Sequence, residues 1–246
     1  MIKRIRGENT EKHVLHFDAG AFADFYEDGG ETRTKAIIDA YLRIGIDAVN
    51  VTTRELGITF TQFEQIHRNI EVPFISANIL VKDTGEPLFE PFLILKVGEK
   101  KIGVVGITDE VPRTWTTSDG GELIVADPVS LARPVIERLA GETDLIILLA
   151  YIPKWRIKEV AEALTGVDLI LASDGVSATR DFVETGGSVA CYAGRQGQYL
   201  GIVSTVTAES DEPVEMEYEL KEITPDMPED PDIKALVERA KAEISN

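Results

Sequence analysis

Residues 144–172, DLIILLAYIPKWRIKEVAEALTGVDLILA, decide the fold class. The run 145–150 is apolar throughout, as expected for a strand that is covered on both faces. Residues 155–164 have helical periodicity and stop before Gly166, and a second apolar run follows at 167–172. A strand, a helix and a strand in this order predict an α/β protein with a parallel sheet.

Similar apolar runs occur on both sides of this segment. They predict further strands at 14–17, 48–51, 72–76, 92–97, 101–107, 200–206 and 214–220. Helical periodicity predicts a helix over 34–44 and another over 127–140. Asp127 is a suitable N-cap with Pro128 at the first helical position, and Pro134 should kink this helix.

Local signals refine this pattern. Thr61 and Glu64 have capping-box spacing and should open a short helix. The turn at Gly98 should join two of the strands in a hairpin. The alternation of strands and helices favours a mainly parallel sheet with helices packed on it. We expect the strands at 14–17, 48–51, 145–150 and 167–172 to share one sheet, with their carboxyl ends lining one cleft.

Composition limits the function classes. The chain has 246 residues, of which 43% are apolar, enough for one sizeable core in a single domain. Its net charge of -18 disfavours nucleic acid and anionic membranes as partners. The lone Cys191 predicts a buried thiol without a disulfide. No export signal follows the basic residues 1–6, so we expect a cytoplasmic protein, or a periplasmic one if the chain has been trimmed.

The last residues differ in character from the rest. Residues 225–231 are rich in proline and acidic side chains, which is typical of a linker. A helical stripe follows, made of Ile233, Leu236, Val237, Ala240 and Ile244. We therefore divide the chain into a domain over 1–224 and a linker with a terminal helix over 225–246. The helix should dock on the domain through Ile233, Leu236, Val237 and Ile244 of this stripe.

Seven short segments carry a family resemblance in order along the chain. They are His16 to Ala21 (HFDAGA), Gly45 to Val51 (GIDAVNV), Pro73 to Asn78 (PFISAN), Lys101 to Ile107 (KIGVVGI), Asp144 to Tyr151 (DLIILLAY), Gly166 to Ile170 (GVDLI) and Gly197 to Gly201 (GQYLG). Together they resemble the N-terminal domain of 5′-nucleotidases, within the calcineurin-like metallophosphoesterases. The resemblance implies a layered β-sandwich flanked by helices, in one domain.

The family resemblance also implies a catalytic centre. Two divalent transition metals would activate a water and hold the phosphoryl oxygens. They would need a bridging carboxylate, an amide oxygen and several imidazoles, and a further histidine would serve the leaving group.

This sequence lacks most of those groups. The positions that hold metal ligands in the family are Ala21, Thr53, Tyr151, Asp174 and Val176, and the catalytic histidine is replaced by Arg54. Only Asp174 among these remains a good ligand. A guanidinium stays protonated at neutral pH and cannot act as a general acid or base. His13, His16 and His67 fall on none of these positions.

The family's first motif, D-x-H after an initial strand, has no counterpart. Residues 2–5 are a candidate remnant of that strand, with Glu8 near the lost aspartate. A longer precursor or a partner chain would otherwise have to supply the strand. Restoring it would leave the other replaced positions without their usual groups.

These replacements predict a non-catalytic member of the fold, without a metal cofactor, that acts in binding or assembly. The cleft would keep Asp18, Arg54, Glu55 and Asp174, with Arg54 paired to Asp174 or Asp18 in place of the lost metal charge. The partner would be a protein or a small ligand. The rival hypothesis is a phosphoric ester hydrolase with a rebuilt site, for example one metal on Asp18, Glu55 and Asp174.

Overall fold

The computed structural model describes residues 1–23, 25, 27–57, 60–68, 70–206 and 215–245. Its helices are α1 (Ile2–Glu8), α2 (Gly30–Ile44), α3 (Thr53–Leu56), α4 (Thr61–His67), α5 (Pro128–Leu139), α6 (Ile157–Ala163) and α7 (Pro231–Ile244). Its strands are β1 (Phe17–Asp18), β2 (Ala48–Asn50), β3 (Phe74–Ile75), β4 (Ile79–Val81), β5 (Phe92–Val97), β6 (Lys100–Thr108), β7 (Val111–Thr116), β8 (Glu122–Val125), β9 (Leu145–Tyr151), β10 (Leu169–Ser173), β11 (Val183–Glu184), β12 (Val189–Tyr192), β13 (Tyr199–Val206) and β14 (Glu215–Glu222).

The segment 144–172 forms the predicted parallel pair. β9 and β10 run parallel in register, with Leu169 opposite Ile147, and α6 connects them. Alternate residues of β9 face opposite layers: Ile146 and Leu148 pack toward the helices α5 and α6, while Ile147 packs toward a second sheet. A strand covered on both faces explains the all-apolar run in the sequence.

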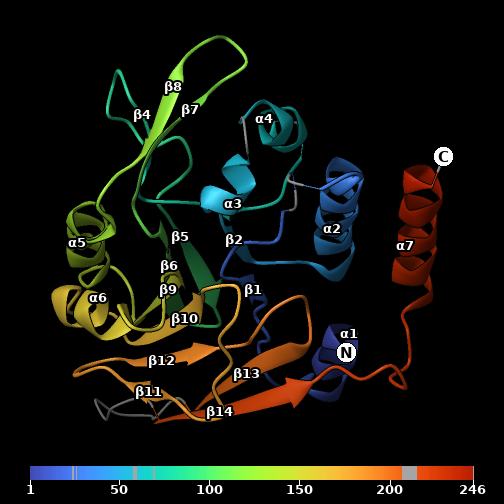
Figure 1. The fold of residues 1–246 in the computed structure, drawn as a ribbon. Coiled ribbons are helices and arrows are strands. Elements are labelled where there is room, and N and C mark those ends of the chain that lie inside the picture. Colours follow the sequence, from blue (N-terminus) through green and yellow to red (C-terminus); the bar gives the residue numbers. More distant parts are fainter. Residues whose placement is uncertain (24, 26, 58–59, 69, 207–214, 246) are drawn as a thin grey trace.

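The larger sheet has the order β11-β12-β10-β9-β6-β5, and a smaller parallel sheet has the order β1-β2-β3. The two sheets stack on one another, with Ala48, Ile75, Val104 and Leu149 between them. Helices α5 and α6 cover the outside of the larger sheet, and α2 and α4 cover the outside of the smaller one (Figure 1). The result is a helix–sheet–sheet–helix sandwich, the fold class predicted from the sequence.

The prediction that the four strands share one sheet is wrong. β1 and β2 belong to the smaller sheet, whereas β9 and β10 belong to the larger. Each sheet buries one face against the other, so their strands have equally apolar sequences and periodicity does not separate them. A mainly parallel sheet is confirmed for β6, β9, β10 and β12, while the edge strands β5 and β11 run antiparallel.

Gly106 allows the sheets to approach closely. A Cβ atom there would lie 2.6 Å from the Asn50 side-chain oxygen and 2.9 Å from the Ile75 carbonyl oxygen. Hydrogen bonds also join the sheets at this point, from the Ala77 N–H to the Gly106 carbonyl and from the Asn50 amide to the Ile107 carbonyl. The glycine therefore fixes the spacing between the two layers.

Two smaller sheets complete the fold. β13 and β14 form an antiparallel hairpin, of which Val214, within the predicted strand 214–220, lies outside the described residues. β4, β8 and β7 form a sheet that the sequence did not predict. The hairpin predicted around Gly98 is confirmed as β5 and β6.

Several helix predictions need correction. Residues 2–5 belong to α1 and not to a strand remnant. α2 starts at Gly30, four residues earlier than expected, and α5 remains one helix through Pro134. α4 starts at Thr61, but its N-cap is Phe60, which makes no side-chain cap bond. The Thr–x–x–Glu box that forms is the one at Thr52, described below.

α7 packs against α2, away from the rest of the sandwich (Figure 1). Asp230 caps it through the N–H groups of Asp232 and Ile233. Of the predicted docking stripe, Leu236 is 5% exposed, whereas Val237 is 40% exposed. Fewer side chains of the stripe are buried than predicted, so α7 docks through a smaller apolar contact.

Candidate functional site

The strands of both sheets end at a common edge, which we call the carboxyl edge. β6, β9 and β10 end in register, with Tyr151 opposite both Thr108 and Ser173. The buried Asn50, at the end of β2, donates to the Ile107 carbonyl at 2.8 Å and to the Ala19 carbonyl at 3.0 Å. Asn50 thus ties the ends of β1, β2 and β6 together, and its own Oδ1 has no partner within the described residues.

Asp18 lies at this edge on β1, with both carboxylate oxygens occupied. Oδ1 accepts the Gly20 N–H at 2.8 Å, and Oδ2 accepts the Tyr41 hydroxyl of α2 at 2.5 Å. Burial raises the pKa of Asp18, and the hydrogen bonds from Tyr41 and Gly20 oppose this shift. Tyr41 lies within the helix predicted over 34–44, but its contact with Asp18 spans 23 residues and has no local sequence signal.

Glu55 is fully buried inside a capping box that begins α3. Its Oε2 accepts the Thr52 N–H at 2.8 Å and the Thr52 hydroxyl at 2.6 Å, while Oε1 accepts the Ala23 N–H at 3.0 Å. Burial raises the pKa of Glu55 despite these bonds, and the charge of Asp18 adds to the rise. The Thr–x–x–Glu spacing at Thr52 was a sequence signal for this box.

Asp174 follows β10 and has turned toward its own loop. It accepts the N–H groups of Val176 at 3.0 Å and of Ser177 at 2.6 Å, and the Ser177 hydroxyl at 2.7 Å. Burial acts to raise the pKa of Asp174, but these bonds, with one from the Lys154 N–H, hold it below the usual value. The Asp174 carboxylate therefore stabilises the conformation of its own loop.

The replaced family positions lie on α3 and in the segments that follow β1, β9 and β10. Thr53 and Arg54 lie on α3, where Arg54 is exposed. Ala21 has a left-handed backbone with φ of 67°, and its N–H points toward Glu55. Tyr151 ends β9, and Val176 is 71% exposed.

The predicted ion pair of Arg54 does not form. Among the residues that the structure describes, neither Asp18 nor Asp174 forms an ion pair with the guanidinium, and both carboxylates accept hydrogen bonds from other groups. Arg54 makes other interactions. Its exposure fits a residue on the rim of the edge.

These residues do not fit a dinuclear metal centre. Within the described part of the chain, no three His, Cys, Asp or Glu side chains are grouped as a metal site requires. Asp18 and Glu55 lie close enough for their charges to interact, but Asp174 belongs to a separate loop. His16 precedes β1 at its other end, and His67 packs among aromatic rings on α4.

None of the described helices has the length and apolar character needed to cross a bilayer. Cys191 is a free, buried thiol, as predicted.

Comparisons with known proteins give a consistent set of relatives. No protein-family model matches the chain. It is 25% identical over 177 residues to a probable 5′-nucleotidase of Treponema pallidum, covering 70% of this chain and 29% of that protein. It is 29% identical over 214 residues to YunD, an uncharacterized metallophosphoesterase of Bacillus subtilis, covering 85% and 45%. The chain thus spans less than half of either relative.

Solved structures share the fold over nearly the whole chain. A 5′-nucleotidase precursor from Thermus thermophilus superposes with a TM-score of 0.84 at 19% identity, covering 99% of this chain and 52% of that one. The sulfate thiohydrolase SoxB of the same genus has a TM-score of 0.82 at 20% identity, covering 98% and 45%. The architecture of these chains and of this one is therefore the same over the sandwich.

Proposed function

We propose that this chain, a homologue of the N-terminal domains of 5′-nucleotidases and of other calcineurin-like metallophosphoesterases, acts by binding a partner at the carboxyl edge and does not hydrolyse phosphoesters there. The relatives are similar to it in sequence and fold, and phosphoester hydrolysis is the activity that this likeness suggests. We propose a different role because of the side chains that stand at the carboxyl edge.

The observation that carries the proposal is the occupancy of the carboxylates. Asp18, Glu55 and Asp174 accept hydrogen bonds from N–H and O–H groups of their own surroundings. A divalent cation would have to displace these donors, and the imidazole and amide ligands that would compensate are replaced. Arg54 also cannot exchange protons at neutral pH, so the leaving group lacks its acid.

Metal content and hydrolysis test the proposal together. The protein is produced with zinc, manganese and iron in the medium, and its metal content is measured by elemental analysis. We expect well under one ion per chain, with no turnover of p-nitrophenyl phosphate or of bis(p-nitrophenyl) phosphate above a heat-denatured sample.

A matched pair of variants separates the rival hypothesis. If the chain hydrolyses either ester and Asp18→Asn abolishes both metal and activity while the exposed Asp39→Asn does not, the rival of a rebuilt metal site is correct. Such a result would make the chain a phosphoric ester hydrolase and would overturn the proposal.

A further inference from the structure

Aspartate is followed directly by glycine at three places in the sequence, Asp28, Asp119 and Asp174. In such a pair the backbone nitrogen of the glycine can attack the side-chain carboxyl carbon of the aspartate and close a five-membered ring. Glycine favours this attack because it has no side chain to hinder the approach and its backbone adopts many conformations. The reactivity of each pair therefore depends on how firmly the fold holds it.

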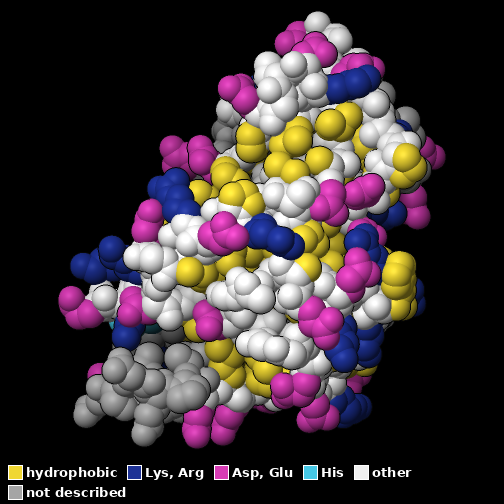
Figure 2. Space-filling view, turned by 90° about the vertical axis from the view of Figure 1, so that its left-hand side faces the viewer, with side chains coloured by type: hydrophobic (Ala, Val, Ile, Leu, Met, Phe, Trp, Pro, Cys, Tyr) yellow, Lys and Arg dark blue, Asp and Glu magenta, His cyan; other side chains and the backbone are white. Residues whose placement is uncertain are grey.

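The pair at Asp119 lies at the tip of the hairpin formed by β7 and β8, where Figure 2 shows acidic side chains at the surface. Its carboxylate accepts the Thr117 hydroxyl at 2.5 Å and the Gly121 N–H at 3.3 Å, and both bonds lower the pKa of Asp119. The attacking nitrogen is also engaged, since the Gly120 N–H donates to the Thr117 carbonyl at 3.1 Å. This pair is exposed but restrained.

The pair at Asp174 is restrained in a similar way. Its carboxylate accepts the N–H groups of Val176 and Ser177 and the Ser177 hydroxyl. Burial alone would raise the pKa of Asp174, but these bonds hold it below the ordinary value. The carboxyl group must be neutral to lose its oxygen as water, so a lowered pKa slows ring closure at both restrained pairs.

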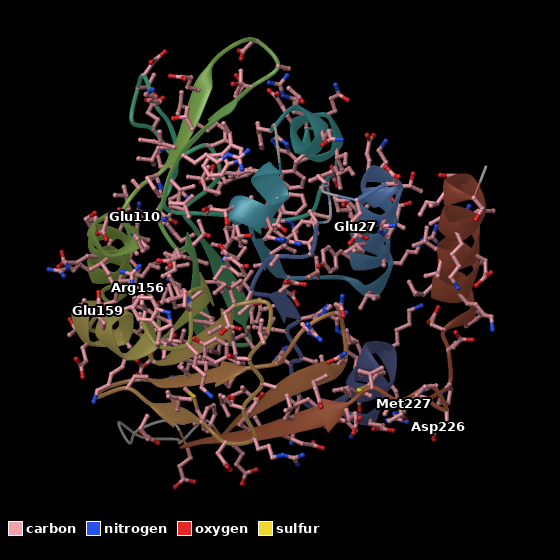
Figure 3. All side chains as sticks on the ribbon, viewed as in Figure 1. Glu27, Glu110, Arg156, Glu159, Asp226 and Met227 are labelled. Carbon is pink, nitrogen blue, oxygen red and sulfur yellow. The ribbon has the colours of Figure 1, made fainter. Side chains whose placement is uncertain are left out.

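Asp28 is exposed in the turn that leads into α2. The Gly30 N–H donates to the Glu27 carbonyl at 2.9 Å, and Gly29 has φ of 74° and ψ of 5°, as at the second central position of a type II turn. Figure 3 shows Glu27 beside α2. Among the residues that the structure describes, no hydrogen-bond donor pairs with the Asp28 carboxylate and no acceptor pairs with the Gly29 N–H.

The peptide between Asp28 and Gly29 must rotate out of this turn before the ring closes. Within the described residues, that rotation breaks one hydrogen bond, the one that the Gly30 N–H donates. Ring closure at Asp119 must break three, two to its carboxylate and one from the attacking N–H, and ring closure at Asp174 must break three to its carboxylate. The fold therefore protects two of the three pairs and leaves the third open.

From this comparison we infer that Asp28 is a modification site, at which the aspartate isomerises without an enzyme to a β-linked isoaspartate. The Gly29 nitrogen bonds to Cγ of the neutral Asp28 carboxyl group, and the carboxyl oxygen leaves as water with the amide proton. A second water then opens the ring. Attack at Cγ restores the aspartate, whereas attack at the backbone carbonyl carbon of Asp28 routes the main chain through the side chain. Water is the only co-reactant, and the product has the same mass as the starting chain.

The product would alter the contact between α2 and α7. Isomerisation adds one methylene group to the backbone directly before Gly29, whose carbonyl accepts the Arg33 N–H in the first turn of α2 at 3.0 Å. Gly29 also lies against Ile244 of α7, since a Cβ atom there would be 2.7 Å from the Ile244 Cγ2. Displacing Gly29 therefore weakens the docking of α7, whatever the carboxyl edge binds.

The test ages the full chain in a mildly acidic buffer made with water enriched in heavy oxygen. Each ring opening adds one heavy oxygen to the chain. Tryptic peptides are then prepared in ordinary water, and liquid chromatography with mass spectrometry locates the label and separates β-linked from α-linked peptides. We expect Asp28 to gain at least about tenfold more label and isoaspartate than Asp119 or Asp174, as expected when each of those sites must break two further hydrogen bonds of ordinary strength.

Variants separate the structural explanation from the sequence motif alone. Asp28→Glu keeps the charge but would need a six-membered ring, so it should abolish labelling at this turn, and Asp119→Glu should leave labelling of Asp28 unchanged. Thr117→Val removes a donor to Asp119 and should raise isomerisation there. Aged wild type should develop a fraction with a lower melting temperature that aged Asp28→Glu lacks, while the fresh proteins should unfold alike.

Three results would overturn the inference. The first is equal labelling of the three pairs in the folded protein, and the second is labelling that is greatest at Asp119 or Asp174. The third is identical unfolding of aged wild type and aged Asp28→Glu after Asp28 has isomerised, which would refute the effect on α7. Wild type unfolded in urea serves as the reference, because all three pairs should react at similar rates once their hydrogen bonds are lost.

Discussion

Asp18 and Glu55 are the most constrained side chains of the carboxyl edge. Glu55 is buried and Asp18 is half-buried, each accepts several hydrogen bonds, and the charge of Asp18 acts on Glu55. Among the described residues, the donors to Asp18 and Glu55 are neutral N–H and O–H groups, and these hydrogen bonds oppose the repulsion between the two carboxylates.

We predict that Asp18→Asn raises the stability of the protein above that of wild type at neutral pH. The difference between variant and wild type should shrink at acidic pH. The folded pKa of Asp18 is raised, so the folded chain binds more protons than the unfolded chain, and stability falls as pH rises through that window. The asparagine oxygen can still accept the Gly20 N–H. The gain should be on the order of 1.4 kcal/mol for every tenfold difference between the acid dissociation constants of Asp18 in the folded and unfolded chains.

Urea unfolding between about pH 3 and pH 8 measures this effect, since that range includes both the ordinary aspartate pKa and neutral pH. Asp39→Asn, an exposed aspartate on α2, is the control and should leave the pH profile unchanged. If Asp18→Asn also has the wild-type profile, the raised pKa of Asp18 is wrong.

At the scale of elements, the spacing of the two sheets depends on Gly106. We predict that Gly106→Ala lowers the free energy of unfolding by about 1–3 kcal/mol, because its methyl group would press on Asn50 and on the Ile75 backbone. Chemical denaturation measures the loss. Gly141→Ala is the control, since its nearest neighbouring atom would lie 3.7 Å away. Equal stability of the two variants would mean that the sheets are less tightly packed at this point.

The docking of α7 rests mainly on one side chain. Leu236→Ala should lower the free energy of unfolding by about 2–3 kcal/mol, because the Leu236 side chain of α7 is only 5% exposed. Val237→Ala, on the same helix but 40% exposed, should change stability by less than about 0.5 kcal/mol. Thermal unfolding of both variants decides. A free α7 would tolerate both substitutions equally.

For the whole molecule, charge repulsion opposes compaction. A net charge of -18 predicts that sodium chloride raises the melting temperature, because screening weakens repulsion among the excess acidic side chains. A gain of about 1 kcal/mol would shift the melting temperature by roughly 2–4 °C for a chain of this size. Calorimetry in chloride salts of sodium and of the bulkier tetramethylammonium separates screening from ion binding. A melting temperature that falls with both salts would contradict the prediction.

Sequence patterns predicted most elements but not their partners. The apolar run of β9 and the cap at Asp127 are local signals, and both are confirmed. Which sheet a strand joins depends on contacts such as that between Gly106 and Asn50, 56 residues apart, which no local period contains. The same holds for the site: the replaced ligand positions were identified by resemblance, but the bond between Asp18 and Tyr41 was not visible in the sequence.

The contact between α2 and α7 also orders events on the ribosome. α2 is synthesised before β2 and every later described element, and α7 follows all of them. The Ile244 side chain packs against Gly29, just before α2, so this corner is completed only after the strands of both stacked sheets have emerged. A nascent chain arrested before residue 231 would therefore display the uncovered side of α2, and we expect it to recruit chaperones that the finished protein does not.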